Sequence, residues 1–172
     1  MNRIIDFHSH ILCGADHGSK SIDTSRAQLE LMHSGETAIA VATPHFYPDK
    51  TSLEDFLCTV ERSLNEMKSL APCNSPELCI GAEVLLCDGL DRMEGLDKLC
   101  IRGTRCILLE LPMGGALIRK CLDTVERIID SGYTVVLAHI DRYVKDNEEE
   151  IDAILSMGAM AQINAEGFAS FF

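Results

Sequence analysis

Residues 4–20 read IIDFHSHILCGADHGSK, a short apolar run followed by a segment rich in histidine and aspartate. The apolar run predicts a strand over residues 4–7. His8 and His10 follow it directly, and a glycine-containing loop then carries Asp16 and His17. In an extended segment, side chains two positions apart point to the same face, so both imidazoles can reach one cation. The stretch therefore predicts a metal site at the end of the first strand.

Apolar runs and amphipathic helical patterns alternate along the rest of the chain. The predicted strands cover residues 4–7, 38–42, 78–86, 106–111, 134–138 and 160–164, and the predicted helices cover residues 21–34, 52–71, 88–96, 116–131 and 147–157. Ser52 is a plausible N-cap of its helix, with Asp55 three residues later, and Asn147 is the predicted cap of the last helix. In the helix over 116–131, Leu117 and Cys121 are predicted to face the core.

Six strands with helical connections predict an α/β fold with a parallel sheet. The periodicity alone leaves a barrel and a doubly wound sheet open. At 172 residues, the chain has the length of one domain, predicted to span residues 1–172.

Imidazoles and carboxylates recur near the C-terminal ends of the predicted strands. They are His45, Glu83, Glu110 and His139, and Arg142 follows three residues after the last of them. The C-terminal ends of parallel strands share one edge, where the sites of α/β proteins lie. Judged alone, any one of these histidines is more often a hydrogen-bonded core residue than a ligand. Together with His8 and His10 at the end of the first strand, five strand ends agree, which predicts a site for divalent cations, since charged carboxylates are rarely buried without a partner.

The composition disfavours several classes of partner. The net charge of -12 makes nucleic acid and anionic membrane surfaces poor partners. The sequence has no apolar run of membrane-spanning length and no secretory signal, so we expect no membrane insertion and a cytoplasmic location. The eight cysteines contain no C-x-x-C motif and are expected to be reduced, mostly as small core residues.

One motif of a different enzyme class needs to be excluded. Cys121 and Arg127 have the C-x5-R spacing of cysteine-dependent phosphatases. The intervening residues contain no glycine for a phosphate-binding loop, and Cys121 lies on the apolar face of a predicted helix. The structural interpretation of Cys121 is therefore favoured.

Six stretches together resemble the PHP (polymerase and histidinol phosphatase) superfamily, and within it the bacterial capsule-type manganese-dependent protein-tyrosine phosphatases. They read DFHSHILCGADHGSKS, VATPHFY, GAEVLL, ILLELP, VVLAHIDRY and MAQINAEGF, and they occur in family order along the chain. The resemblance implies a PHP-type distorted (βα)7 barrel, here with about six βα units because the chain ends before the last one. It also implies a trinuclear metal centre at the C-terminal strand ends.

The resemblance assigns roles to the candidate residues. It implies one metal held by His8, His10 and Glu83, a second held by Glu83, Glu110 and His139, and a third served by His45, with Arg142 directed at the substrate phosphate. It implies two or three Mn²⁺ ions, although iron or zinc would suit the same ligands. The implied substrate is a phosphotyrosine protein, a bacterial tyrosine autokinase, in the regulation of capsule or exopolysaccharide synthesis. A small-molecule phosphatase of the histidinol-phosphate type, and an impaired chain that only binds metal, are the alternatives.

The sequence departs from the family pattern in three places. The family has two consecutive aspartates where this chain has Asp16 and His17, so either His17 replaces the second as a ligand or Asp16 shifts into its place. The family's His-Pro-Glu-Arg is here His139-Ile140-Asp141-Arg142, which keeps the arginine. The family's final strand with its Asp-x-His pair is absent, which predicts weak activity. It also predicts an open sheet edge that is covered by self-association or by residues 165–172.

Overall fold

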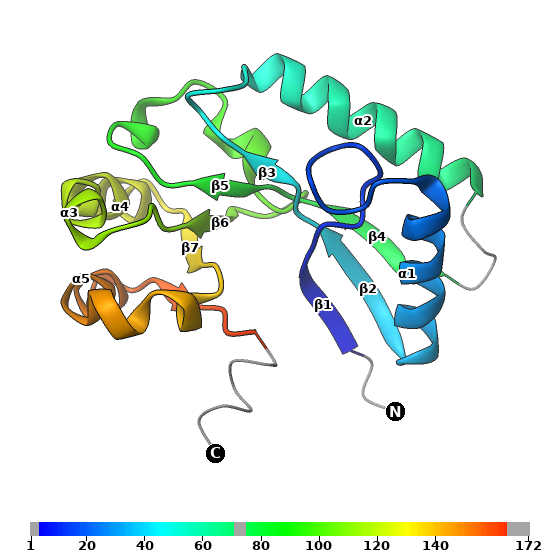
Figure 1. Cartoon of the computed structure of the whole chain (residues 1–172). Coiled ribbons are helices and arrows are strands. Elements are labelled where there is room, and N and C mark those ends of the chain that lie inside the picture. Colours follow the sequence, from blue (N-terminus) through cyan, green and yellow to red (C-terminus); the bar gives the residue numbers. More distant parts are fainter. Residues whose placement is uncertain (1–3, 71–74, 165–172) are drawn as a thin grey trace. The chain divides into compact units, whose positions relative to one another are not determined.

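The computed structural model describes residues 4–70 and 75–164, which form an α/β fold with parallel strands (Figure 1). The chain divides into two compact units, residues 1–82 and residues 83–172. We call them unit 1 and unit 2. The α/β class with parallel strands is confirmed, whereas no closed barrel is detected among the described residues. The single domain over 1–172 stays a prediction, and residues 165–172, predicted to cover a sheet edge, lie outside the described residues.

Unit 1 contains a three-stranded parallel sheet in the order β1-β2-β4. Its elements are β1 (Ile4–Ser9), α1 (Ile22–Ser34), β2 (Thr37–Ala42), β3 (His45–Phe46), α2 (Leu53–Leu70) and β4 (Glu77–Ile80). Helix α1 contacts β2 and α2. The apolar face of α2 is buried through Phe56, Val60, Leu64 and Met67, in agreement with an amphipathic helix. The two-residue strand β3 was not predicted, because two residues show no periodicity.

The caps of the two helices in unit 1 are local, and the Ser52 cap confirms the prediction from the sequence. Ser52 accepts a hydrogen bond from the Asp55 amide at 3.1 Å and donates one to the Asp55 carboxylate at 2.7 Å. Ser21 accepts a hydrogen bond from the Thr24 amide at 3.2 Å, and Gly35 is the C-cap of α1. These contacts satisfy amide groups that the first helical turn leaves without a partner.

Unit 2 contains consecutive parallel neighbours β5, β6, β7 and β8. Its elements are β5 (Glu83–Leu85), η1 (Leu90–Arg92), η2 (Leu96–Leu99), β6 (Cys106–Glu110), α3 (Gly115–Lys120), α4 (Leu122–Asp130), β7 (Thr134–Leu137), η3 (Ile140–Arg142), α5 (Val144–Ser156) and β8 (Met160–Ala161). Helix α4 packs against β7, and α5 packs against α3 and α4. The fully buried residues Ile107, Leu108 and Leu109 make β6 the centre of this core.

Several predicted elements are divided in the structure. The strand predicted over 78–86 is two strands, since β4 pairs with β2 and β5 pairs with β6. The helix predicted over 88–96 is replaced by the 3₁₀ turns η1 and η2, each preceded by a glycine with positive φ. The last helix begins at Val144, three residues earlier than predicted, and has non-helical backbone at Asn147.

The helix predicted over 116–131 is broken at Cys121 into α3 and α4. Cys121 has φ -97° and ψ -2°, so the residues on either side of it do not share one helical face. Cys121 is buried as predicted, but Leu117 on α3 is 49% exposed, so its predicted inward orientation is wrong.

Candidate metal centre

The His8-Ser9-His10 segment at the end of β1 places two imidazole nitrogens close together. Ser9 is fixed toward β2, because its hydroxyl donates to the Val41 carbonyl at 2.9 Å. The flanking rings meet, with His8 Nε2 3.2 Å from His10 Nε2. Metal–imidazole bonds of about 2.1 Å would join both nitrogens to one cation at an angle of about 100°. The pair therefore has the spacing of two ligands of one ion.

Asp16 lies beside this pair and accepts three hydrogen bonds. Its Oδ2 atom accepts from His10 Nδ1 at 2.6 Å and from the His45 amide at 3.0 Å, and its Oδ1 atom accepts from the Gly18 amide at 2.8 Å. Burial raises the pKa of Asp16, but the hydrogen bonds from His10, Gly18 and His45 outweigh it and lower the pKa to about 2. Asp16 is consequently ionised at neutral pH.

Three imidazoles stack next to Asp16. The ring centroids of His10 and His45 are 4.6 Å apart, and those of His17 and His45 are 4.7 Å apart with planes inclined by 17°. The Tyr47 ring also stacks on His45, with ring centroids 5.2 Å apart. One potential ligand atom each of His10, Asp16 and His45 lies within 4.8 Å of the others.

Unit 2 has a second group of candidate ligands, formed by Glu83, Glu110 and His139. Glu83 is the first residue of β5, Glu110 is the last residue of β6, and His139 follows β7. The Glu83 side chain is fully buried, with Oε1 2.5 Å from His139 Nε2, and Glu110 Oε1 lies 4.0 Å from the same nitrogen. Two carboxylates and an imidazole form a donor set that suits Mn²⁺, iron or zinc.

The position of His139 depends on backbone strain and on Gln162. His139 has a φ of 34°, an uncommon conformation for a residue other than glycine. Its amide donates to Gln162 Oε1 at 2.6 Å, and the Gln162 amide donates to the Leu137 carbonyl at 2.8 Å. Such strain persists where surrounding contacts impose it, and it is frequent at functional sites. Sequence reasoning missed Gln162, although it lies in the quoted MAQINAEGF stretch directly after β8.

Arg142 is exposed at the end of η3, three residues after His139. The backbone next to it is tied down, because the neighbouring Asp141 carboxylate accepts from the Asn164 amide at 3.0 Å. The Arg142 guanidinium is already solvent-accessible and is carried by an anchored turn, so it can bind a phosphate group without first moving out of the protein interior.

Cys121 does not have the environment of a catalytic nucleophile. Its side chain is buried at the junction of α3 and α4, and burial raises its pKa to about 11. Catalytic thiols have lowered pKa values and partial exposure. The structure thus agrees with the rejection of the C-x5-R motif.

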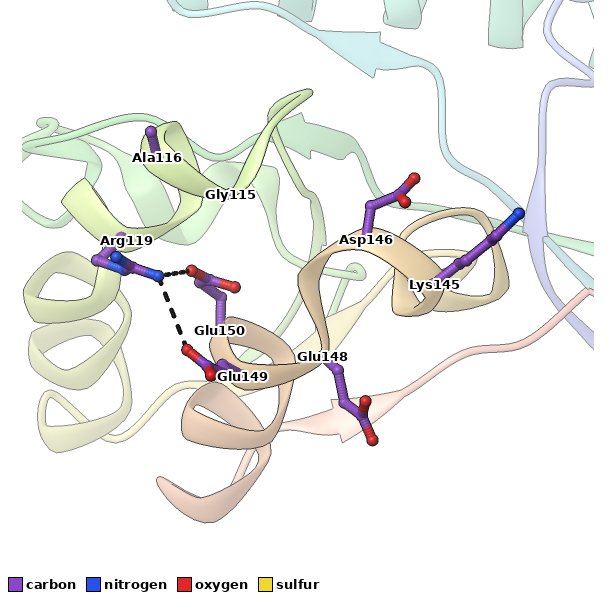
Figure 2. A pocket seen from close by; sticks show the side chains of 8 residues that line it. All are labelled: Gly115, Ala116, Arg119, Lys145, Asp146, Glu148, Glu149 and Glu150. Atoms are coloured by element: carbon purple, nitrogen blue, oxygen red, sulfur yellow. Dashed lines mark hydrogen bonds and ion pairs between the residues drawn. The ribbon is translucent and has the colours of Figure 1, made fainter.

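A pocket elsewhere in unit 2 lies between the start of α3 and the start of α5 (Figure 2). Arg119 points into it and pairs with Glu150 and Glu149, and Asp146 and Glu148 also line it. None of the predicted site residues lines this pocket. The carboxylates are exposed apart from Glu150, which Arg119 neutralises. The pocket is therefore a solvated ion-pair network rather than a candidate active site.

The family model described as capsular polysaccharide synthesis, CpsB/CapC, matches residues 4–170. The chain belongs to the CpsB/CapC family. The match runs through both units and includes every predicted site residue, from His8 to Arg142. It confirms the resemblance to the bacterial capsule-type phosphatases on which the candidate residues were assigned.

Two curated relatives in the CpsB/CapC family are named as phosphatases. The chain is 29% identical over 173 residues to the tyrosine-protein phosphatase CpsB of Streptococcus pneumoniae, a match that covers 94% of this chain and 68% of the relative. It is 27% identical over 176 residues to the putative tyrosine-protein phosphatase CapC of Staphylococcus aureus, covering 98% of this chain and 67% of the relative. The chain thus spans about two thirds of the length of these relatives.

A solved structure has the same fold. The match is to a chain from the crystal structures of YwqE from Bacillus subtilis and CpsB from S. pneumoniae, described as unique metal-dependent tyrosine phosphatases. The TM-score is 0.74 at 20% identity, over 93% of this chain and 66% of that chain. In this CpsB/CapC family member, no helix of the described residues combines the length and the apolar character needed to cross a membrane.

Proposed function

We propose that the chain is a metal-dependent phosphomonoester hydrolase that acts on phosphotyrosine in a protein substrate, in the regulation of capsule or exopolysaccharide synthesis. The proposal follows the family and the names of its relatives. The observation that carries it is the fully buried Glu83 carboxylate in contact with His139 Nε2, with Glu110 nearby. Burying an ionised carboxylate is costly unless it is paired or binds a metal.

The metal ligands that we propose are those predicted from the sequence. His8 and His10 form one part of the set, Glu83, Glu110 and His139 form another, and His45 serves with either Asp16 or His17. The predicted bridging role of Glu83 between two ions stays a prediction. Mn²⁺ is the proposed metal, with two or three ions per chain, because carboxylate and imidazole donors suit it and the family favours it.

In the proposed hydrolysis of a phosphate ester, the bound metal ions and Arg142 have separate roles. Bound divalent cations would supply a nucleophilic hydroxide at neutral pH and stabilise charge on the phosphoryl oxygens. Arg142 would bind the phosphate with two parallel N–H donors and a permanent charge. The phenolate of tyrosine has a pKa of about 10, so it leaves with less help from a general acid than an alkoxide would. No cysteine takes part, in agreement with the buried Cys121.

We further propose the finer features that the resemblance implies. The parallel βα units are those of a PHP-type barrel of about six units in one domain. The protein substrate is a bacterial tyrosine autokinase, and the chain acts in the cytoplasm and self-associates. A small-molecule phosphatase and an impaired metal-binding chain are the alternatives that the experiment below separates.

The test compares two substrates and two metal states. Purified protein is stripped with EDTA, reloaded with Mn²⁺, and assayed for phosphate release from a phosphotyrosyl peptide and from histidinol phosphate. We expect Mn²⁺-dependent release that is faster from the peptide. Faster release from histidinol phosphate would favour the small-molecule alternative. Metal binding without release from either substrate would show an impaired chain and would contradict the proposed activity.

A further inference from the structure

Three nitrogen atoms from separate parts of unit 1 converge on the Asp16 carboxylate. They are the His10 ring at the end of β1, the Gly18 amide in the following loop and the His45 amide in β3, at 2.6, 2.8 and 3.0 Å. The Asp16 side chain is only 5% exposed. Three of the roughly four acceptor positions of a carboxylate are used in these contacts, so the group has little remaining capacity to bind an ion directly.

The loop is built to hold this arrangement. A Cβ atom at Gly18 would lie 2.4 Å from the His10 Cβ and 2.5 Å from the His10 carbonyl oxygen, so only glycine fits so close to His10. The Ser19 amide also donates to the His10 carbonyl at 3.0 Å. The turn therefore packs closely against both the backbone and the side chain of His10.

The direction of these hydrogen bonds defines the state of the His10 ring. Backbone amides only donate, so the Gly18 and His45 amides both need an acceptor oxygen of Asp16, and an ionised carboxylate can only accept at its contact with His10 as well. The proton of the contact between His10 and Asp16 is consequently on Nδ1. A neutral His10 then has its lone pair on Nε2, the atom that lies 3.2 Å from His8 Nε2. Metal-binding histidines commonly donate their other ring N–H to a carboxylate in this way.

We propose that Asp16 is a positioning residue that holds His10 as the Nδ1–H tautomer, with Nε2 presented to a cation, and that His17 is the additional ligand from this loop. The inference rests on the proposed function in taking a divalent cation as the ligand. His17 is exposed, and its ring stacks on His45 with centroids 4.7 Å apart. This exposed ring therefore lies next to the proposed ligand His45.

The first test is the tautomer of His10 in the metal-free chain of residues 1–172, measured from the ¹⁵N chemical shifts of the imidazole nitrogens. We expect Nδ1 to carry the proton. In Asp16→Ala, the free preference of neutral imidazole for the Nε2–H form should return. In Asp16→Asn, the amide oxygen can still accept from His10, and the tautomer should be kept. The matched control is Asp55→Asn, which changes a carboxylate that accepts from Ser52 at the start of α2.

The second test is Mn²⁺ affinity, followed by the EPR signal of free Mn²⁺. Loss of a hydrogen-bond partner behind a ligand lowers affinity by about 10–100-fold, so we expect this loss in Asp16→Ala and a smaller loss in Asp16→Asn. His17→Ala should bind Mn²⁺ more weakly while keeping the His10 tautomer. The control Asp55→Asn should match the wild type in both measurements.

The outcomes separate the positioning role from the alternatives. An Nε2–H tautomer of His10 in the wild-type chain would overturn the proposal without any variant, even if Asp16→Ala does not fold. Equal losses of Mn²⁺ affinity in Asp16→Asn and Asp16→Ala would identify Asp16 as a ligand. Unchanged affinity in His17→Ala would overturn the role of His17. Since the tautomer is measured without metal or substrate, absence of phosphatase activity would contradict only the proposed function.

Discussion

The substitution Glu83→Gln separates metal binding from folding at the second group of ligands. In the wild type, His139 Nε2 lies 2.5 Å from Glu83 Oε1. Glutamine has nearly the same shape as glutamate, and its Oε1 atom can still accept a hydrogen bond from His139 Nε2. A charge-assisted hydrogen bond is worth about 1.5–3 kcal/mol and a neutral one about 0.5–1.5 kcal/mol. We therefore expect the metal-free variant to lose only about 1–2 kcal/mol of unfolding free energy.

The effect of added metal should be much larger in the wild type. At a Mn²⁺ concentration of about 100 times Kd, binding stabilises the folded state by about 2.7 kcal/mol. For a chain of 172 residues, this corresponds to a rise in Tm of roughly 5–10 °C. If the amide lowers the affinity about 100-fold, the same Mn²⁺ concentration gives the variant only about 0.4 kcal/mol, or roughly 1 °C.

The assay is thermal unfolding followed by circular dichroism, with EDTA and with Mn²⁺, on the wild type, Glu83→Gln and Glu126→Gln. Glu126 is an exposed residue of α4, which makes its variant the matched control in the same unit. The control should keep the full Mn²⁺-dependent shift. A shift in Glu83→Gln equal to that of the wild type would refute the reasoning, because the stabilising ion would then bind without this carboxylate.

Three further predictions concern other parts of the chain. Arg142→Lys should keep the metal content, measured by elemental analysis, but lower kcat/KM about 10-fold or more, because lysine loses the paired donors; loss of metal would contradict a phosphate-binding role. Burial raises the pKa of Cys121 to about 11, so iodoacetamide at pH 8 should label the exposed Cys58 first, as mass spectrometry can check, and should leave phosphatase activity unchanged. Labelling of Cys121 should rise only as the pH approaches the pKa of its thiol. Gly18→Ala should destabilise the fold by about 1–3 kcal/mol in urea unfolding, since its Cβ would overlap His10; unchanged stability would show that the loop can move.

Features that depend on neighbouring residues were determined by the sequence itself. The Ser52 cap with Asp55 and the end of α1 at Gly35 need contacts within only a few residues. The buried face of α2 follows from its helical period. The α/β class follows in the same way, because strand and helix patterns alternate over the whole chain.

The candidate ligands could also be named from the sequence, since parallel strands bring their C-terminal ends to one edge of a sheet. Position alone, however, does not distinguish a ligand from a residue that supports one. Asp16 and His17 are adjacent in the sequence, and our proposal that they have different roles rests on the three hydrogen bonds to Asp16 that the tertiary structure shows.

The tertiary structure decided where continuous patterns are interrupted. Residues 78–86 have the composition of one strand, but the pairing of β4 with β2 and of β5 with β6 divides them. The break at Cys121 exposes Leu117, although the two residues have the spacing of one helical face. The strained backbone of His139 is held by a hydrogen bond from its amide to Gln162, which lies 23 residues further along the chain. These features depend on contacts between residues distant in sequence, and local propensity and periodicity carry no information about such contacts.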